Sequence, residues 1–203
     1  MKVCVIDYKM GNLGSIANVL EEIKCNYVIS NRAKEIEESD KLVLPGVGAF
    51  LKGMDNLRKL GLVDILGREV LVKRKPILGV CLGMQLFADK GFENGEHRGL
   101  GWISGEVKRL FPNDNTLKVP HVGWNDIKIK KDSKLFLKIG GDASFYFVHS
   151  YYFSAPEENV TSTFEYGGEF TASVEKGNLF GAQFHPEKSA ENGLTLLKNF
   201  VGV

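Results

Sequence analysis

The segment Pro76-Ile77-Leu78-Gly79-Val80-Cys81-Leu82-Gly83 leads from a short apolar run into a helical pattern. Its last five residues spell G-x-C-x-G, the thiol version of the nucleophile elbow. Glycine has no Cβ, so a sharp strand-to-helix turn can pack closely on its neighbours at both glycine positions. Such a turn lifts the thiol above the carboxyl edge of a parallel sheet, where open α/β folds keep their sites. The segment predicts an α/β fold with Cys81 as nucleophile, while a small residue in a tight turn stays an open alternative.

The start of the expected helix favours the same chemistry at Cys81. The partial positive charge of a helix N-terminus stabilises a thiolate. The free amide of Leu82, the next residue, can point at an oxygen that becomes negatively charged during a reaction. Cys81 and Leu82 are therefore expected to share one reaction centre.

Strand and helix patterns alternate through the first half of the chain. Strands are expected at 2–7, 27–30, 41–44 and 76–80, and helices at 12–24, 53–73 and 82–89. This alternation predicts a mainly parallel sheet with helices on both faces. The second half is richer in strands, expected at 107–110, 126–129, 145–148, 159–164, 170–174 and 179–184, before a last helix at 191–200. We therefore expect one α/β domain, residues 1–203, with extra antiparallel strands in its C-terminal half.

Composition and charge narrow the function classes. A chain of 203 residues can bury one sizeable core, and a net charge of +1 favours neither nucleic acid nor a membrane surface as partner. No apolar run approaches the roughly 20 residues of a membrane span, and the N-terminus becomes acidic too early for a signal peptide, so a cytoplasmic protein is expected. Cys4, Cys25 and Cys81 lie far apart without metal-binding spacing. No disulfide framework, metal or cofactor is therefore expected.

A histidine and a glutamate follow the last expected strand, in Gln183-Phe184-His185-Pro186-Glu187. An imidazole that titrates near neutral pH can take the thiol proton and later protonate a departing amine. Glu187 can hold the ring in one tautomer and stabilise its charged form. A surface loop with an incidental His-Glu pair leaves the elbow unexplained, and a zinc site would use up the thiol as a ligand. The pattern therefore predicts Cys81, His185 and Glu187 as catalytic residues.

Several motifs resemble the class I glutamine amidotransferases, and among them the glutaminase subunits of imidazole glycerol phosphate synthase. The cysteine motif and His185-Pro186-Glu187 are shared by the wider class. The further motifs are Asp7-Tyr8-Lys9-Met10-Gly11-Asn12-Leu13, Leu44-Pro45-Gly46-Val47-Gly48-Ala49-Phe50, Gly99-Leu100-Gly101-Trp102, Val119-Pro120-His121-Val122-Gly123-Trp124-Asn125 and Val148-His149-Ser150-Tyr151. The resemblance runs from Lys2 to Phe200 and implies hydrolysis of glutamine to glutamate and ammonia.

The resemblance also implies a role for each matched residue. The residues expected to form the oxyanion site are Gly46, Val47 and Leu82. Those expected to contact the substrate glutamine are Gly48, Gln85, His149 and Ser150. Those expected to face a partner are Asn12, Trp124, Tyr146 and Lys188. The implied partner is a (β/α)8-barrel cyclase that forms a heterodimer with this chain and receives ammonia through its central channel, for imidazole glycerol phosphate formation in histidine biosynthesis.

Each of these roles has a plainer alternative. His149 fits a hydrogen-bonded core histidine, and Asn12 fits a helix cap. Trp124 and Tyr146 are aromatic residues of a type that most often only packs. The glycines on both sides of Val47 make rotation of a peptide there inexpensive, so the oxyanion site is expected to form only when the loaded partner is docked.

Three other functions stay open at this point. Gly14 stands where the family more often has a basic residue, which leaves room for a paralogue that supplies ammonia to a barrel enzyme modifying a surface sugar. A non-catalytic docking module would keep the fold without the reaction. A cysteine hydrolase of peptides or small amides would act without any partner.

Overall fold

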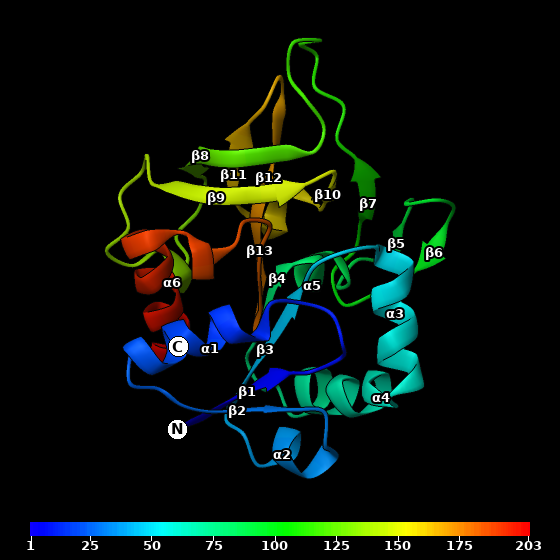
Figure 1. Cartoon of the computed structure of the whole chain (residues 1–203), viewed down its shortest axis with the longest axis vertical. Helices are drawn as coiled ribbons and strands as arrows, with labels where there is room; N and C mark the ends of the chain where they lie inside the picture. The colour runs from blue at the N-terminus through cyan, green and yellow to red at the C-terminus, as the bar shows by residue number, and fades with distance from the viewer.

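A nine-stranded mixed sheet crosses the molecule in the computed structural model, which describes residues 1–203 (Figure 1). Its parallel half runs in the order β2 (Asn26–Ser30), β1 (Lys2–Ile6), β3 (Lys41–Gly46), β4 (Ile77–Cys81) and β13 (Leu179–Ala182). Its antiparallel half continues with β12 (Glu169–Lys176), β11 (Val160–Glu165), β8 (His121–Ile129) and β9 (Ser144–His149). The parallel sheet with antiparallel additions that the sequence predicts is confirmed.

A second, four-stranded sheet lies beside the first and was not expected. Its strands follow the order β10 (Tyr151–Ser154), β7 (Glu106–Arg109), β5 (Lys90–Gly91) and β6 (His97–Arg98). β7 pairs antiparallel with β10 and parallel with β5. Strands as short as β5 and β6 depend on these neighbours, so no local pattern marks them in the sequence.

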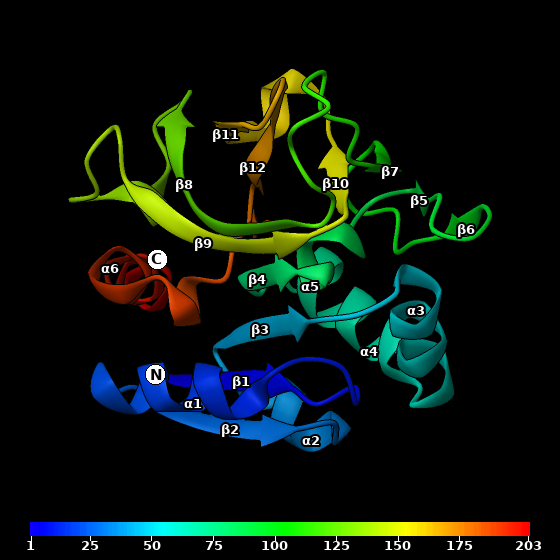
Figure 2. The same cartoon turned by 45° about the horizontal axis from the view of Figure 1, so that its top comes forward.

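Two hydrophobic cores, each of 24 buried residues, lie on the two faces of the parallel strands. Side chains alternate along a strand, so Val3 and Val5 of β1 enter one core while Cys4 and Ile6 enter the other. The first core is covered by α1 (Leu13–Glu22) and α6 (Ala190–Gly202), and the second by α2 (Ala33–Glu37), α3 (Phe50–Lys59) and α4 (Leu62–Gly67) (Figure 2). Burial on both faces explains why β1 reads as a continuous apolar run. No helix here combines the length and the apolar character that crossing a membrane requires.

Two helices are shorter than the sequence predicts. The helix expected at 53–73 is interrupted at Gly61, whose φ of +65° lies in the left-handed region that glycine adopts without a steric penalty. Its C-terminal part, Arg68–Val72, is π-helical. The helix expected at 82–89 is a single turn, α5 (Leu82–Gln85). Because the macrodipole sums over aligned peptides, one turn stabilises a thiolate at Cys81 less than the longer expected helix would.

The strand β3 continues past the end that the sequence predicts. It runs through Pro45 to Gly46, and Gly46 pairs with Cys81 at the end of β4. The chain of the expected oxyanion segment thus lies directly beside the nucleophile elbow. Three short 3-10 segments complete the fold: η2 (Lys134–Phe136), η3 (Glu157–Asn159) and η4 (Pro186–Lys188).

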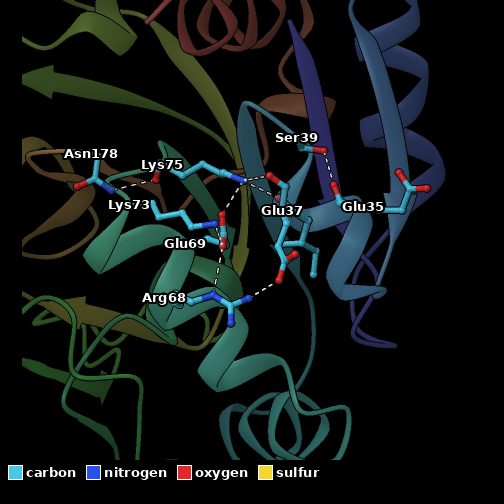
Figure 3. A network of polar contacts seen from close by, with 9 residues as sticks. Glu35, Glu37, Ser39, Arg68, Glu69, Lys73, Lys75 and Asn178 are labelled. Carbon is cyan, nitrogen blue, oxygen red and sulfur yellow. Dashed lines mark hydrogen bonds and ion pairs between the residues drawn. The ribbon is translucent and has the colours of Figure 1, made fainter.

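A polar network around Glu69 ties together the end of the sheet opposite the elbow (Figure 3). The carboxylate of Glu69 is fully buried and forms ion pairs with Lys73 at 2.8 Å and Lys75 at 2.9 Å. Lys75 also donates hydrogen bonds to the carbonyl oxygens of Ile36 and Glu37, at 2.7 and 3.0 Å. Burial alone would raise the pKa of Glu69, but hydrogen bonds from the two lysines lower it. The network joins the π-helical segment to α2 and to the chain that enters β4.

Candidate active site

Cys81 sits at a strained junction between β4 and α5. Its φ and ψ are +52° and −111°, a region that residues with a side chain rarely adopt. Packing requires the glycine on each side. A Cβ at Gly79 would lie 2.7 Å from the backbone of Met84, and a Cβ at Gly83 would overlap the carbonyl oxygen of Leu44. The sharp elbow that the two glycines predict is therefore present.

His185 and Glu187 form a buried pair at the start of η4. Nδ1 of His185 donates to Oε1 of Glu187 at 2.7 Å, because an ionised carboxylate can only accept. The backbone of His185 is fixed as well: its amide donates to the carbonyl oxygen of Tyr146 at 2.9 Å, and its own carbonyl accepts from Ser189 Oγ at 2.6 Å. Nε2 of His185 is buried without a hydrogen-bond partner. That nitrogen is the one left free to exchange a proton.

The charge state of His185 reflects its two neighbours. Burial lowers the pKa of His185, but interactions with the side chains of Cys81 and Glu187 outweigh it and raise the pKa to about 10. β13, which His185 follows, pairs with β4, and Nε2 of Gln183 donates to Sγ of Cys81 at 3.7 Å, so the elbow sulfur lies beside the segment that carries the imidazole. This imidazole is more basic than the near-neutral one that the sequence indicates, and it keeps its proton at neutral pH. The protonated imidazole already holds the proton that a departing amine needs.

A cavity of about 500 Å³ opens at the elbow. Eight of its lining residues are ones that the sequence singled out: Val47, Gly48, Cys81, Leu82, Gln85, His149, Ser150 and Lys188. Ala49, Pro120, Val148 and Tyr151 also line it and belong to the motifs quoted from the sequence, whereas Glu93 lies outside those motifs. Gly46, His185 and Glu187 lie outside this lining. Residues expected to bind substrate, to hold an oxyanion and to attack thus face a single space.

The side chains of Gln85 and His149 are already engaged by the protein. Nε2 of Gln85 donates to the carbonyl oxygen of Tyr151 at 2.8 Å and to Oε1 of Gln183 at 3.0 Å, which uses both of its hydrogens. The ring of His149 contacts the same Tyr151 oxygen at 2.8 Å and Nδ1 of His121 at 3.2 Å. Burial lowers the pKa of His149 to about 3, so its ring is neutral. For the ring of His149, the alternative of a hydrogen-bonded core histidine is therefore the better description.

The sequence from residue 4 to residue 202 matches the family model described as glutamine amidotransferase class-I. The chain belongs to the class I glutamine amidotransferase family. This amidotransferase is 48% identical over 199 residues to the imidazole glycerol phosphate synthase subunit HisH 1 of Campylobacter jejuni (strain RM1221), and the match covers 98% of each chain. It is 44% identical to the imidazole glycerol phosphate synthase subunit HisH of Pelagibacter ubique (strain HTCC1062), over 100% of both chains. A solved structure described as a glutamine amidotransferase has the same fold, with a TM-score of 0.75 at 20% identity over 99% of each chain.

The amidotransferase holds its nucleophile with a residue that the sequence did not single out, Gln183. This side chain is fully buried, and its Nε2 donates to Sγ of Cys81 at 3.7 Å. Its Oε1 accepts the hydrogen bond from Gln85, so Gln183 links the elbow to the first helical turn behind it. The one available signal is its position two residues before His185, since alternate residues of an extended segment point the same way.

Glu93 is a second residue of the amidotransferase site that the sequence did not single out. It lies between β5 and β6 and lines the cavity at the elbow. Its Oε2 accepts a hydrogen bond of 2.7 Å from the backbone amide of Phe50, the first residue of α3. Glu93 therefore caps the helix that follows the expected oxyanion segment, a contact that no local sequence pattern reveals.

Three of the four residues expected to face a partner come together in the amidotransferase. Trp124 on β8 pairs with Tyr146 on β9, and their rings meet edge to face at a centroid distance of 6.2 Å. The Lys188 ammonium lies over the Tyr146 ring, 5.7 Å from its centroid. The fourth residue, Asn12, is exposed, and its side chain caps α1 by accepting from the amide of Ser15 at 3.3 Å. Asn12 therefore caps a helix, as the plainer alternative predicts, and its role toward a partner stays a prediction.

Proposed function

We propose that this amidotransferase is the glutaminase subunit of an imidazole glycerol phosphate synthase, which releases ammonia for a cyclase partner in histidine biosynthesis. The observation that carries the glutaminase activity is the placement of Cys81 beside the buried His185–Glu187 pair, at a cavity of about 500 Å³. Near-full-length identity of 44–48% to HisH subunits supports the assignment to this synthase.

The first half of the reaction forms a thioester and releases ammonia. The Cys81 thiolate attacks the side-chain carbonyl carbon of glutamine, a carbon–sulfur bond forms, and the carbonyl electron pair moves to oxygen. The backbone amides of Leu82 and of the Gly46–Val47 segment hold this oxyanion. When the oxyanion collapses, the carbon–nitrogen bond breaks and the His185 imidazolium gives its Nε2 proton to the departing amine. Ammonia leaves, and γ-glutamyl thioester and neutral His185 remain.

The second half restores the enzyme. Neutral His185 takes a proton from water at Nε2 while the water oxygen attacks the thioester carbon. The carbon–sulfur bond then breaks, glutamate departs, and the thiolate–imidazolium pair is regenerated. Glu187 holds Nδ1 throughout, so the same nitrogen faces the reaction in both halves. No metal or cofactor takes part in these steps.

The cavity also supplies groups for the amino-acid end of glutamine. Glu93 contributes a carboxylate that attracts the α-ammonium group. Oε1 of Gln85 accepts no hydrogen bond within the protein and is an acceptor for the same ammonium. Gly48 and Ser150 lie in the same lining and offer backbone amides to the α-carboxylate. Discrimination for glutamine over simple amides rests on these contacts.

The partner is proposed to be a (β/α)8-barrel cyclase that docks over the cavity. Val122 and Trp124 of β8 are 55% and 54% exposed, a large apolar exposure for two residues on one strand. Val148, which pairs with Val122, lines the cavity, and so does Lys188 beside Tyr146. The exposed apolar face thus borders the space from which ammonia leaves, so a partner seated there can receive it.

Regulation by the partner is proposed to act on the oxyanion segment. Val47 is 42% exposed and is followed by Gly48, whose φ is +99°. Glycine neighbours allow the Gly46–Val47 peptide to rotate at little cost. We expect the isolated chain to be nearly inactive, because the oxyanion amide turns toward the cavity only when the loaded partner is docked.

The decisive experiment measures ammonia release from glutamine by the purified chain, alone and with the histidine-pathway cyclase subunit and its ligand. The expected result is a low rate alone, a large stimulation by the loaded partner, and no activity for Cys81→Ala, which should still bind the partner. A Cys81→Ala variant that turns over glutamine contradicts the catalytic assignment. Full activity of the isolated chain contradicts the proposed regulation.

A second candidate partner deserves the same assay. Relatives named HisH 1 and HisH 2, from Campylobacter jejuni and Vibrio vulnificus, carry numbers that distinguish more than one such subunit. A paralogue could supply ammonia to a barrel enzyme that modifies a surface sugar. Stimulation by that enzyme with its substrate, and not by the histidine-pathway cyclase, would transfer the proposal to the paralogue while leaving the glutaminase chemistry intact.

A further inference from the structure

Tyr8 carries a buried hydroxyl that has no role in the fold as it stands. Its side chain is fully buried, two residues after the end of β1, and its Oη has no hydrogen-bond partner. Buried tyrosine hydroxyls usually find a partner, because an unpaired polar group in the interior costs stability. The backbone next to it is well held, since the Tyr8 carbonyl oxygen accepts from Asn56 Nδ2 at 3.0 Å. An orphan hydroxyl on a fixed residue calls for a functional explanation.

The hydroxyl lies directly against the oxyanion segment. A Cβ built on Gly46 would overlap Tyr8 Oη, so only glycine allows this approach. Gly46 is the last residue of β3 and pairs with Cys81. Burial, and after it the negative charge of Cys81, raise the pKa of Tyr8 far above its usual range. The hydroxyl therefore keeps its hydrogen and can act only as a neutral donor or acceptor at physiological pH.

Rotation of the Gly46–Val47 peptide would give this hydroxyl a partner. A peptide that turns its amide toward the cavity must turn its carbonyl oxygen the opposite way, because the two groups point in opposite directions across the planar unit. Tyr8 Oη lies on the side of Gly46 where a side chain would otherwise stand. A Gly46 carbonyl oxygen turned to this side would give the unpaired hydroxyl of Tyr8 an acceptor.

We propose that Tyr8 is a positioning residue for the oxyanion site, whose hydroxyl donates a hydrogen bond to the Gly46 carbonyl oxygen when the Val47 amide turns toward the cavity. This inference rests on the proposed glutaminase function and deepens it. The bond exists in only one of two peptide orientations, so it shifts the balance between them toward the active one. The partner then needs a smaller difference in affinity between the active and inactive states to switch the enzyme on.

The test compares Tyr8→Phe with the parent chain, each in complex with the cyclase partner and its ligand. The readouts are kcat and KM for glutamine, the thermal unfolding midpoint, and the rate at which iodoacetamide alkylates Cys81. We expect kcat to fall about tenfold, the typical value of one hydrogen bond formed only in the competent state. KM, the alkylation rate and the unfolding midpoint should not fall, because the hydroxyl contacts neither substrate nor a partner in the present state.

Tyr27→Phe is the matched control. It removes a hydroxyl that donates to Glu21 Oε1 at 2.6 Å on the surface, and it should leave kcat unchanged. A kcat for Tyr8→Phe within twofold of the parent overturns the inference, and so does a loss of kcat matched by a lower unfolding midpoint or by slower alkylation of Cys81. An inactive parent complex overturns the proposed function and this inference together, whereas an active parent with an unaffected Tyr8→Phe overturns this inference alone.

Discussion

Nδ1 of His185 donates a 2.7 Å hydrogen bond to Oε1 of Glu187, and the two side chains are only 2% and 3% exposed. The bond fixes which ring nitrogen carries a permanent hydrogen and leaves Nε2 for the chemistry. Because water is excluded from the pair, its electrostatic effect on the ring is strong. Glu187 should therefore control both the orientation of His185 and its affinity for a proton.

Glu187→Gln should reduce kcat for glutamine by about 10²–10⁴-fold, the usual contribution of a well-placed acid–base group. The amide keeps the shape of the carboxylate, but it cannot stabilise an imidazolium and can hold the ring in the wrong tautomer. Steady-state assays with the partner present measure this effect. Glu191→Gln, an exposed change in the first turn of α6, is the control and should leave kcat unchanged. Equal rates for both variants would remove Glu187 from the mechanism.

The pH dependence of the reaction follows from the raised pKa of His185. The ring is protonated below about pH 10, and the activity that needs its proton is lost as pH rises through that value. The alkaline limb of the kcat/KM profile should therefore report the loss of the His185 proton. Glu187 is one of the groups that raise the pKa, so Glu187→Gln should move the limb to lower pH. A limb at the same pH in both proteins would show that another group controls it.

The elbow shows how much of this molecule local patterns could predict. An apolar run and the glycines at 79 and 83 are features of adjacent residues in the sequence. They therefore sufficed to predict β4, the sharp turn after it and the parallel sheet. The two-residue strands β5 and β6 exist only because β7 lies beside them, and no periodicity could reveal them. The break at Gly61 was hidden because the apolar spacing continues on both sides of it.

The site could be predicted by residue type but not by hydrogen bonding. Cys81 and His185 belong to recognisable motifs, and the pairing of β4 with β13 brings the segments that carry them side by side. Both ring nitrogens of His149 are occupied, one by Tyr151 and the other by His121. These contacts form only where three strands meet, and no local sequence pattern shows which strands will meet. Glu93 escaped notice for the same reason, since its contact with the α3 terminus crosses between two distant segments.

Gly83→Ala should destabilise the protein and impair the elbow. The added Cβ would overlap the carbonyl oxygen of Leu44, a backbone atom that cannot move without displacing β3. Overpacking of this kind typically costs about 1–3 kcal/mol. Gly67→Ala is the matched control, because Gly67 is helical and nothing lies within 4 Å of its added Cβ. Chemical denaturation should show a lower free energy of unfolding for Gly83→Ala. For Gly67→Ala it should show a free energy of unfolding that is higher by up to about 1 kcal/mol.

Trp124→Ala should weaken binding to the cyclase partner. An exposed tryptophan next to Tyr146 and Lys188 has the character of an interface hot spot, so a loss of at least about 2 kcal/mol, or roughly 30-fold in Kd, is expected. Val72→Ala removes an apolar side chain that is 75% exposed at the opposite end of the sheet, and it should leave Kd unchanged. Titration calorimetry with both variants measures the difference. Similar affinities would place the partner elsewhere on the surface.

Glu69→Gln should lower stability in a way that depends on pH. The carboxylate is buried between Lys73 and Lys75, and its pKa in the folded state lies below the unfolded value of 4.5. Its contribution is therefore fully present above about pH 4.5 and is lost as pH falls through the lower folded pKa. Near pH 7 the free energy of unfolding of the variant should be about 3 kcal/mol lower, because the lysines lose a buried counter-charge. Below pH 4.5 the free energies of unfolding of the two proteins should converge.

Glu158→Gln, an exposed change outside any ion pair, should have the same free energy of unfolding as the parent at every pH. A difference in free energy of unfolding between Glu69→Gln and the parent that stays constant with pH would contradict this prediction. It would mean that the shape of the Glu69 side chain, and not its charge, stabilises this end of the sheet.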